Sequence, residues 1–132
     1  MTATADPRGT DEGPALTLPD PQVPDPSTAP PLRWGVISPG HIADQFTATA
    51  HRATASRVVS VVSRSQQRAD AFAAKHGLER AFSSVADMLA AGGIDAVYVA
   101  SPHAQHHALT RPVIEAGIPA LVEKAFTLNT AQ

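Results

Sequence analysis

The segment GVISPGHIA, at positions 35–43, could bind the pyrophosphate of a dinucleotide. It lies where an apolar run gives way to a helical pattern, so Gly40 would let the backbone approach an anion at the start of a helix. Ala43 would let that helix pack closely on the strand. Ser38 stands where the common G-x-G-x-x-G pattern has its first glycine, and an ordinary strand-to-helix turn explains Gly40 about as well.

The end of the second apolar run bears on which dinucleotide would bind. Proteins that bind NAD usually carry an Asp or Glu here, which holds the ribose hydroxyls. This chain instead has Ser63, Arg64 and Ser65, and no carboxylate. Hydroxyls and a guanidinium can bind a 2′-phosphate, so the segment favours NADP over NAD as the cofactor. The alternative is that Ser65 only caps a helix and that Arg64 is a solvated surface charge.

Three histidines, His103, His106 and His107, follow a later apolar run, just after Ser101 and Pro102. Their helical spacing suggests zinc, but a zinc site needs three or four ligands, and no cysteine or nearby acidic residue completes the set. We therefore expect no metal. Because an open parallel sheet binds its ligand at the carboxyl ends of its strands, His103 could instead reach the cofactor ribose or nicotinamide. We expect His107 on the surface.

Lys124 directly follows the last apolar run, residues 120–123. A lysine at the carboxyl end of a strand can point into a cleft. Its ammonium could there steady a developing alkoxide or relay its proton during hydride transfer, which makes Lys124 the candidate catalytic residue. The alternative is an exposed ion pair between Glu123 and Lys124, which would contribute little.

The elements that must position these residues alternate between strands and helices, a pattern typical of βαβ units around a parallel sheet. The strands are apolar almost throughout, which suits a sheet covered on both faces. The expected strands are 32–38, 57–63, 80–82, 96–100 and 120–123. The expected helices are 41–51, 66–76, 85–91 and 104–116, with Pro112 kinking the last, and a further helix beginning at Thr127. The predicted fold is a doubly wound α/β domain.

Local signals mark several helix ends. Ser84 and Asp87 resemble a capping box that opens the third helix. Gly77 stands where a left-handed C-cap of the second helix belongs, and Gly117 follows the fourth. These signals support the expected boundaries.

Residues 1–31 differ in composition from the rest of the chain. Eight of the twelve prolines fall there, and the segment has no aromatic residue and no isoleucine. Prolines remove hydrogen-bond donors and favour extended backbone, and the segment has no apolar set that could form a core. We therefore expect a disordered proline-rich arm at 1–31 and one folded domain at 32–132.

Charge and cysteine content argue against several classes of protein. A net charge of −2 gives no basic surface for nucleic acid or anionic lipid, so we expect a small-molecule partner. The chain has no cysteine, hence no disulfide framework, which favours a cytoplasmic location. No apolar run is long enough to span a bilayer, and the first residues do not read as a secretory signal.

Taken together, these segments resemble the Gfo/Idh/MocA oxidoreductase family, within it the branch of dimeric dihydrodiol and NADP-linked sugar dehydrogenases. The likeness runs from Leu32 to the end. It rests on the RWGVIS-x-G-x-IA opening, the SRS after the second strand, the segment IDAVYVASPHAQH, and AG followed six residues on by EK. The resemblance implies a Rossmann domain that binds a nicotinamide cofactor, followed by a larger β-sheet domain. A sugar, polyol or diol would lie between the two.

The resemblance also implies roles for individual residues. Glu123 and Lys124 match the start of the family's EKP motif, whose lysine lies beside nicotinamide and substrate, although Ala125 replaces the proline. The residues implied to bind the cofactor fall into three groups. They are Ser38, Gly40, His41 and Ile42 at the pyrophosphate, Ser63 and Arg64 at the adenosine phosphate, and Ser101, Pro102, His103, His106 and Glu123 towards the nicotinamide.

Measured against the family pattern, the sequence ends before the last Rossmann strand and before the substrate domain. The expected function is therefore NADP binding within an oxidoreductase that acts on a sugar, polyol or diol, and we do not expect this chain to be active alone. Two alternatives stay open. One is a nucleotide-binding remnant without catalysis, and the other is a subunit whose substrate domain lies on another polypeptide. An unpaired sheet edge would also favour homo-oligomers.

Overall fold

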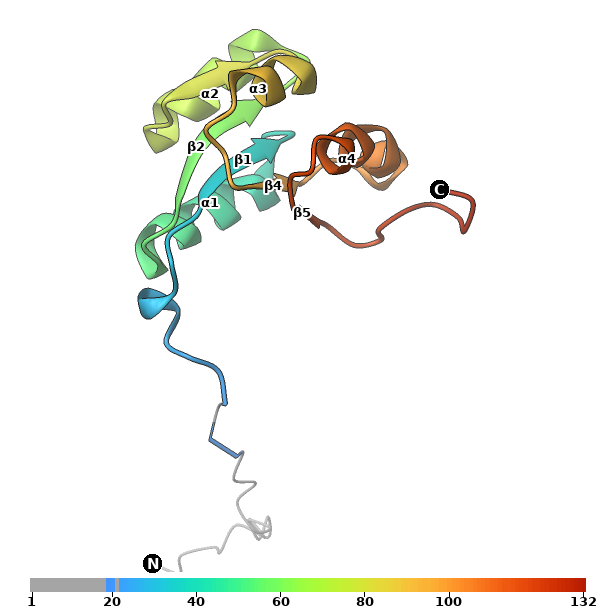
Figure 1. Cartoon of the computed structure of the whole chain (residues 1–132). Coiled ribbons are helices and arrows are strands. Elements are labelled where there is room, and N and C mark those ends of the chain that lie inside the picture. Colours follow the sequence, from blue (N-terminus) through green and yellow to red (C-terminus); the bar gives the residue numbers. More distant parts are fainter. Residues whose placement is uncertain (1–18, 21) are drawn as a thin grey trace, which may run out of the picture.

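The computed structural model describes residues 19–20 and 22–132 (Figure 1). Most of the arm for which disorder is expected, residues 1–18 and 21, lies outside the described residues. The described part of the arm contains one 3-10 turn, η1 (Pro26–Thr28). The carboxylate of Asp25 caps this turn by accepting a hydrogen bond from the backbone N–H of Ser27 at 2.8 Å.

The fold is built on one parallel sheet of five strands in the order β3-β2-β1-β4-β5. The strands are β1 (Arg33–Ile37), β2 (Arg57–Val62), β3 (Arg80–Phe82), β4 (Ala96–Val99) and β5 (Ala120–Val122). Every neighbouring pair is parallel. The chain moves outwards from β1 to β3 and then crosses to β4, so the strand order reverses between β1 and β4. This is the point where open α/β sheets bind their ligands.

Helices cover both faces of the sheet, as the apolar strands predict. They are α1 (His41–Ala53), α2 (Gln66–His76), α3 (Val85–Ala91), η2 (His103–Gln105) and α4 (His106–Glu115). One core contains Val36, Val61 and Tyr98 and is closed by α1 and α2. The other contains Ile37 and Val99 and is closed by α3 and α4. The predicted doubly wound α/β fold is confirmed.

Local signals place the helix ends as expected. Ser84 caps α3, its hydroxyl accepting from the backbone N–H of Asp87 at 3.1 Å and donating to the Asp87 carboxylate at 2.7 Å. Gly77 ends α2 with φ of +68°, a left-handed conformation that glycine adopts readily. Ser65 caps α2 by accepting from the N–H of Arg68 at 3.3 Å. These confirmed ends set where the loops at the carboxyl edge of the sheet begin.

Two helix predictions need correction. The expected helix 104–116 begins as a separate 3-10 turn, so α4 proper starts at His106. The helix expected from Thr127 is wrong, because residues 127–132 form turns (Figure 1). There the hydroxyl of Thr127 donates to the carbonyl of Asn129 at 3.1 Å, and the Asn129 side chain accepts from the N–H of Ala131 at 3.0 Å. These side-chain bonds compete with a helical backbone ladder.

Within residues 19–20 and 22–132, every helix is too short or too polar to cross a membrane.

Candidate functional site

A cleft of about 720 Å³ lies at the carboxyl ends of the strands. Four loops line it, those that follow β1, β2, β3 and β4. Its walls include Ser38, Gly40, His41, Ile42, Ser63, Arg64, Ser101 and Pro102. The structure therefore brings together the residues predicted from three separate segments of the sequence.

In the turn after β1, Ser38 adopts the backbone conformation expected of the first glycine of the G-x-G-x-x-G pattern. Ser38 has φ of +72°, the only positive φ among the described non-glycine residues, and its N–H donates to the carbonyl of Val62 at 2.9 Å. Ser38 thus occupies the left-handed conformation in place of glycine, at some cost in backbone strain. Gly40 then caps α1 without a side-chain hydrogen bond, and a Cβ there would meet no atom within 4 Å. The start of α1 is therefore left open towards the cleft.

The end of β2 presents cations and hydroxyls. Arg64 is exposed and makes no hydrogen bond or ion pair with another described residue, so its guanidinium is available to a ligand. Ser63 is buried, and its hydroxyl accepts from the N–H of Ser65 at 3.3 Å. Ser65 does cap α2, as the alternative interpretation held. Among the described residues, no Asp or Glu lines the cleft.

Sequence reasoning missed Arg68. Its guanidinium lines the cleft and donates to the carbonyl of Pro39 at 3.1 Å, so α2 is tied to the turn after β1. Arg68 lies in the first turn of α2, four residues after Arg64. The i, i+4 spacing of the two arginines across the start of a helix was the signal that could have found it.

A second hollow of about 480 Å³ adjoins Ser101 and contains Lys124. It is lined by Ile42, Ala100, Ser101, Pro102, His103, Glu123 and Lys124. The hydroxyl of Ser101 is buried and has no partner among the described residues. A buried hydroxyl without a partner costs free energy unless a ligand or water bonds to it, so it supports a polar ligand at this end.

Glu123 is held by Tyr98 from the neighbouring strand. The phenol of Tyr98 donates to the Glu123 carboxylate at 2.6 Å. This hydrogen bond lowers the pKa of Glu123. The pKa of Tyr98 is raised, mainly because the phenol is buried and to a smaller extent because of the same hydrogen bond. Lys124 is exposed and forms no ion pair with Glu123 or any other described residue. Its peptide bond to Ala125 is cis.

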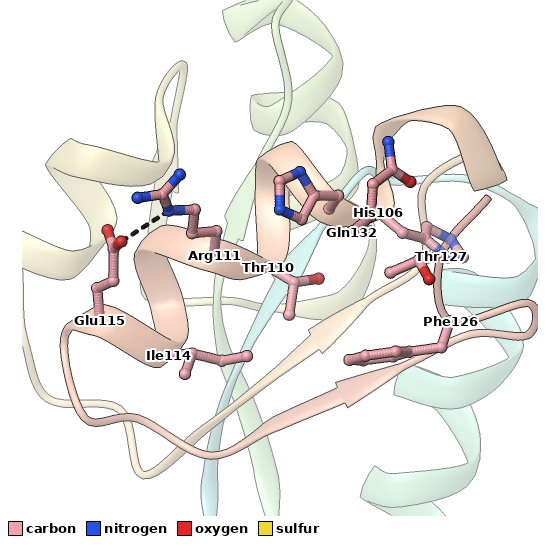
Figure 2. Close-up of a pocket in the computed structure, with 9 residues that line it drawn as sticks. His106, Thr110, Arg111, Ile114, Glu115, Phe126, Thr127 and Gln132 are labelled. Carbon is pink, nitrogen blue, oxygen red and sulfur yellow. Dashed lines mark hydrogen bonds and ion pairs between the residues drawn. The ribbon is translucent and has the colours of Figure 1, made fainter. Parts of the chain in front are cut away.

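His106 differs from the other predicted residues in its position. It is fully buried, and it lines neither the cleft nor the hollow that contains Lys124. It borders a smaller cavity of about 150 Å³ between α4 and the C-terminal segment. Figure 2 shows the apolar side chains of Ile114 and Phe126 beside Thr110 at this cavity. Its role as a direct cofactor contact stays a prediction.

These residues fit a nicotinamide dinucleotide. An open helix start and two arginines suit phosphate groups. The unpartnered hydroxyl of Ser101 and the ammonium of Lys124 lie at the other end of the same edge. Among the described residues, no three His, Asp or Glu side chains gather in a way that could hold a metal ion.

Known proteins share both sequence and fold with this chain. It is 38% identical over 101 residues to scyllo-inositol 2-dehydrogenase (NADP(+)) of Bacillus subtilis, covering 76% of this chain and 31% of that protein. It is 35% identical over 103 residues to trans-1,2-dihydrobenzene-1,2-diol dehydrogenase of Macaca fascicularis, with the same coverage of each. The chain thus spans about 31% of the length of these relatives.

Solved structures and the family profile agree. UDP-N-acetylglucosamine 3-dehydrogenase from Acidithiobacillus ferrooxidans superposes with a TM-score of 0.67 at 32% identity, over 78% of this chain and 32% of that one. An oxidoreductase from Agrobacterium radiobacter, in complex with NAD+, L-tartaric acid and magnesium, gives a TM-score of 0.71 at 23% identity over 76% of this chain and 29% of that one. The profile of the Gfo/Idh/MocA oxidoreductase family, described as an NAD-binding Rossmann fold, matches residues 32–132. The chain therefore belongs to the Gfo/Idh/MocA oxidoreductase family, through its NAD-binding Rossmann domain.

Proposed function

We propose that this chain binds NADP(H) and supplies the cofactor half of an oxidoreductase acting on a CH–OH group of a sugar, polyol or diol. One observation carries the proposal. A single edge of the sheet presents an open helix start, two arginines and no carboxylate in the cleft, and Lys124 in the adjoining hollow. This order of groups matches a 2′-phosphorylated dinucleotide, whose phosphates need positive charge and N–H donors and whose nicotinamide would lie towards Lys124.

Particular residues would hold the cofactor. The N–H groups at the start of α1, exposed by Gly40, would donate to the pyrophosphate. Ser63 and Arg64 would bind the 2′-phosphate, and Arg68 would keep the turn against α2 while adding positive charge. The unpartnered hydroxyl of Ser101 would bond to the nicotinamide half.

The choice of NADP over NAD rests on charge. A carboxylate at the end of β2 would repel a 2′-phosphate, and the cleft has none. The free guanidinium of Arg64 offers charge-assisted hydrogen bonds, each stabilising binding by about 1.5–3 kcal/mol. We therefore expect roughly a tenfold to hundredfold preference for NADPH over NADH.

The chemistry would be hydride transfer, which a bound nicotinamide supplies by accepting a hydride from the alcohol carbon. As an ammonium, Lys124 would stabilise the alkoxide that develops on the substrate oxygen; as a neutral amine, it would take up the proton that leaves the substrate hydroxyl. Glu123 directly precedes Lys124, and its hydrogen bond from Tyr98 would hold the start of the Lys124 loop in place. The substrate class follows the names of the relatives, which are dehydrogenases of an inositol and a cyclic diol and, at 37% identity, 1,5-anhydro-D-fructose reductase of Ensifer adhaerens.

A second candidate function is nucleotide binding without catalysis by this chain alone. The exposure of Lys124 favours it, because a lysine in water has little reason to act as a catalytic group. A separate chain carrying the substrate domain would bury this lysine. Turnover of cyclic polyols or diols by the purified chain, lost in Lys124→Ala, would exclude this second candidate.

The proposed cofactor preference is tested by titrating the purified chain with NADPH and NADH and following nicotinamide fluorescence. Arg64→Ala should remove most of the preference for NADPH while leaving NADH binding nearly unchanged. Arg52→Ala is the matched control, because Arg52 is an exposed arginine in the last turn of α1, away from the residues that line the cleft. Equal affinities of the unmutated chain for the two cofactors would refute the assignment.

Two further expectations are part of the proposal. The cytoplasmic location is one, to be tested by cell fractionation. Self-association is the other, because only β4 pairs with β5 within the described sheet and Leu121 on β5 is 48% exposed. A Leu121→Lys variant should shift the chain towards monomer in size-exclusion chromatography.

A further inference from the structure

His106 makes two short contacts that no role in the cleft explains. It is the first residue of α4, and its side chain is fully buried. Its Nε2 lies 2.7 Å from the carbonyl oxygen of Ser101, and its Nδ1 lies 2.7 Å from the carbonyl oxygen of Ala125. Both distances are at the short end for hydrogen bonds to a carbonyl.

The two contacts together define the protonation state of the ring. A carbonyl oxygen only accepts hydrogen bonds, so each ring nitrogen must donate. A neutral imidazole carries one N–H, whereas the imidazolium carries two. Both contacts of His106 are therefore hydrogen bonds at the same time only when the ring is protonated.

The two carbonyls belong to the loops that follow neighbouring strands. Ser101 follows β4 and lines the cleft, and Ala125 follows β5 directly after Lys124. The rigid ring of His106 contacts one backbone carbonyl in each of these two loops. The distance between the Ser101 loop and the Lys124 loop is thereby set by His106.

We propose that His106 is a positioning residue that, as an imidazolium, ties the loop after β4 to the loop after β5 and so sets Lys124 at the nicotinamide end of the cleft. This inference rests on the proposed function for the meaning of that position. The tie itself is a property of the chain without cofactor. When the ring loses a proton, one of its two carbonyl contacts loses its hydrogen bond and the Lys124 loop is released.

The charges around His106 act in both directions. Glu123 favours the imidazolium, and Lys124 opposes it. The hydrogen bond from Tyr98 is the main cause of the lowered pKa of Glu123, and the positive charges of Lys124 and His106 lower it further. His103 on η2, whose ring centroid is 5.5 Å from that of His106, opposes the imidazolium when it is itself protonated. On α4, His107 and the paired Arg111 and Glu115 also border the cavity beside His106.

The tie is tested first in the unmutated chain without cofactor, by NMR of the ring nitrogens and of the backbone carbonyl carbons. Because both ring nitrogens face carbonyl oxygens, we expect protons on both nitrogens of His106. Raising the pH should remove one proton, and the carbonyl resonance of Ser101 or Ala125 should shift with the same midpoint. A ring with a single proton from about pH 5.5 to 8.5 would overturn the proposal. A ring that keeps both protons throughout would support the tie and show that it does not open in this range.

The positioning role is tested with NADP+ and with 2′,5′-ADP, which carries only the adenosine half. His106→Phe keeps a ring but removes both donors, and we expect it to weaken NADP+ binding on the order of tenfold while changing 2′,5′-ADP binding less than about twofold. His107→Phe is the matched control, because His107 is the next residue of α4 and does not line the cleft; it should change neither affinity. Equal losses for both ligands in a folded His106→Phe chain, or no loss for either, would overturn the role.

The outcomes separate this inference from the proposed function. If the unmutated chain binds neither NADP+ nor 2′,5′-ADP, the proposed function fails, while the NMR titration still decides whether the tie exists. If His106→Phe does not fold, as judged by circular dichroism, His106→Gln replaces it, because its amide can donate two hydrogen bonds without titrating. His106→Gln should bind NADP+ with an affinity that no longer depends on pH in the range where the unmutated chain's affinity does. A pH dependence unchanged from that of the unmutated chain would overturn the proposal.

Discussion

Replacing Gly40, in the turn after β1, or Gly35, within β1, by alanine should separate cofactor binding from stability. At Gly40 the backbone is extended, with φ of −147°, which any residue adopts, and a Cβ would meet no atom within 4 Å. At Gly35 a Cβ would lie 2.9 Å from the sulfur of Met88 and 3.3 Å from the hydroxyl of Ser60, both fully buried. The two positions are five residues apart, yet the same added methyl group meets open space at one and packed core at the other.

The magnitudes follow from these surroundings. Gly40→Ala changes only a helix cap, so its cost in the free energy of unfolding should stay below about 1 kcal/mol. Its methyl group enters the space where the pyrophosphate would approach the start of α1, and losing charge-assisted contacts there should weaken binding by about 1.5–3 kcal/mol, or tenfold to hundredfold. Gly35→Ala overpacks the core and should lower the free energy of unfolding by about 1–3 kcal/mol.

Two assays measure the pair. Urea unfolding followed by the fluorescence of Trp34, the one tryptophan, gives the free energy of unfolding. Titration with NADPH, at a temperature where both variants are folded, gives the affinity. Gly35→Ala serves as the control that destabilises without entering the cleft, and it should bind NADPH nearly as well as the unmutated chain. If Gly40→Ala binds NADPH with unchanged affinity, or loses as much stability as Gly35→Ala, Gly40 does not have the role proposed for it.

Two further predictions concern titrating groups. Burial and then the charge of Arg57 lower the pKa of His51 below its ordinary value of 6.5, and its Nε2 accepts from the N–H of Val58 at 3.0 Å, which only the neutral ring can do. As pH drops, the unfolded chain therefore protonates His51 before the folded chain does, so the free energy of unfolding should fall below a pH of about 6.5. In urea unfolding, His51→Gln should show a shallower fall with pH. A pH dependence of the free energy of unfolding that is the same in His51→Gln would contradict this prediction. Tyr98→Phe removes the hydrogen bond that lowers the pKa of Glu123, so the carboxyl carbon of Glu123 should titrate at higher pH by NMR, and an unchanged titration would show that Tyr98 does not hold it.

Much of the fold follows from patterns that are local in the sequence. Strand apolarity, the capping pair of Ser84 and Asp87, and Gly77 as a C-cap all depend on residues within one element or its ends, and the structure has each as predicted. The helix expected from Thr127 failed for a local reason as well. The side chains of Thr127 and Asn129 form hydrogen bonds with the backbone of their own turn. Thr and Asn are common both in such turns and at helix caps, so the residue types alone do not decide between a turn and a helix.

The candidate site was predicted less completely, because its geometry depends on how distant loops meet. The turn between β1 and α1 imposes the positive φ of Ser38. The residue type does not predict it, because a positive φ is costly for serine. The spacing of the histidines did not separate His103 from His106. The structure places His103 exposed on the 3-10 turn and His106 buried at the start of α4, where it contacts the Lys124 loop, although the two ring centroids are only 5.5 Å apart. Arg68 was overlooked because its contact with Pro39 joins two segments 29 residues apart.

The roles proposed for these residues all require that one edge of the sheet binds NADP(H), from the turn after β1 to Lys124. Titrating the ¹⁵N-labelled chain with NADP+ and following the backbone amides by NMR tests it most directly. We expect saturable shifts at Gly40, at Ser63 and Arg64, and at Ser101, with the amides around Ile114 at the cavity of Figure 2 unchanged. Shifts confined to that cavity, or the absence of saturable shifts at Gly40 and Arg64, would contradict it.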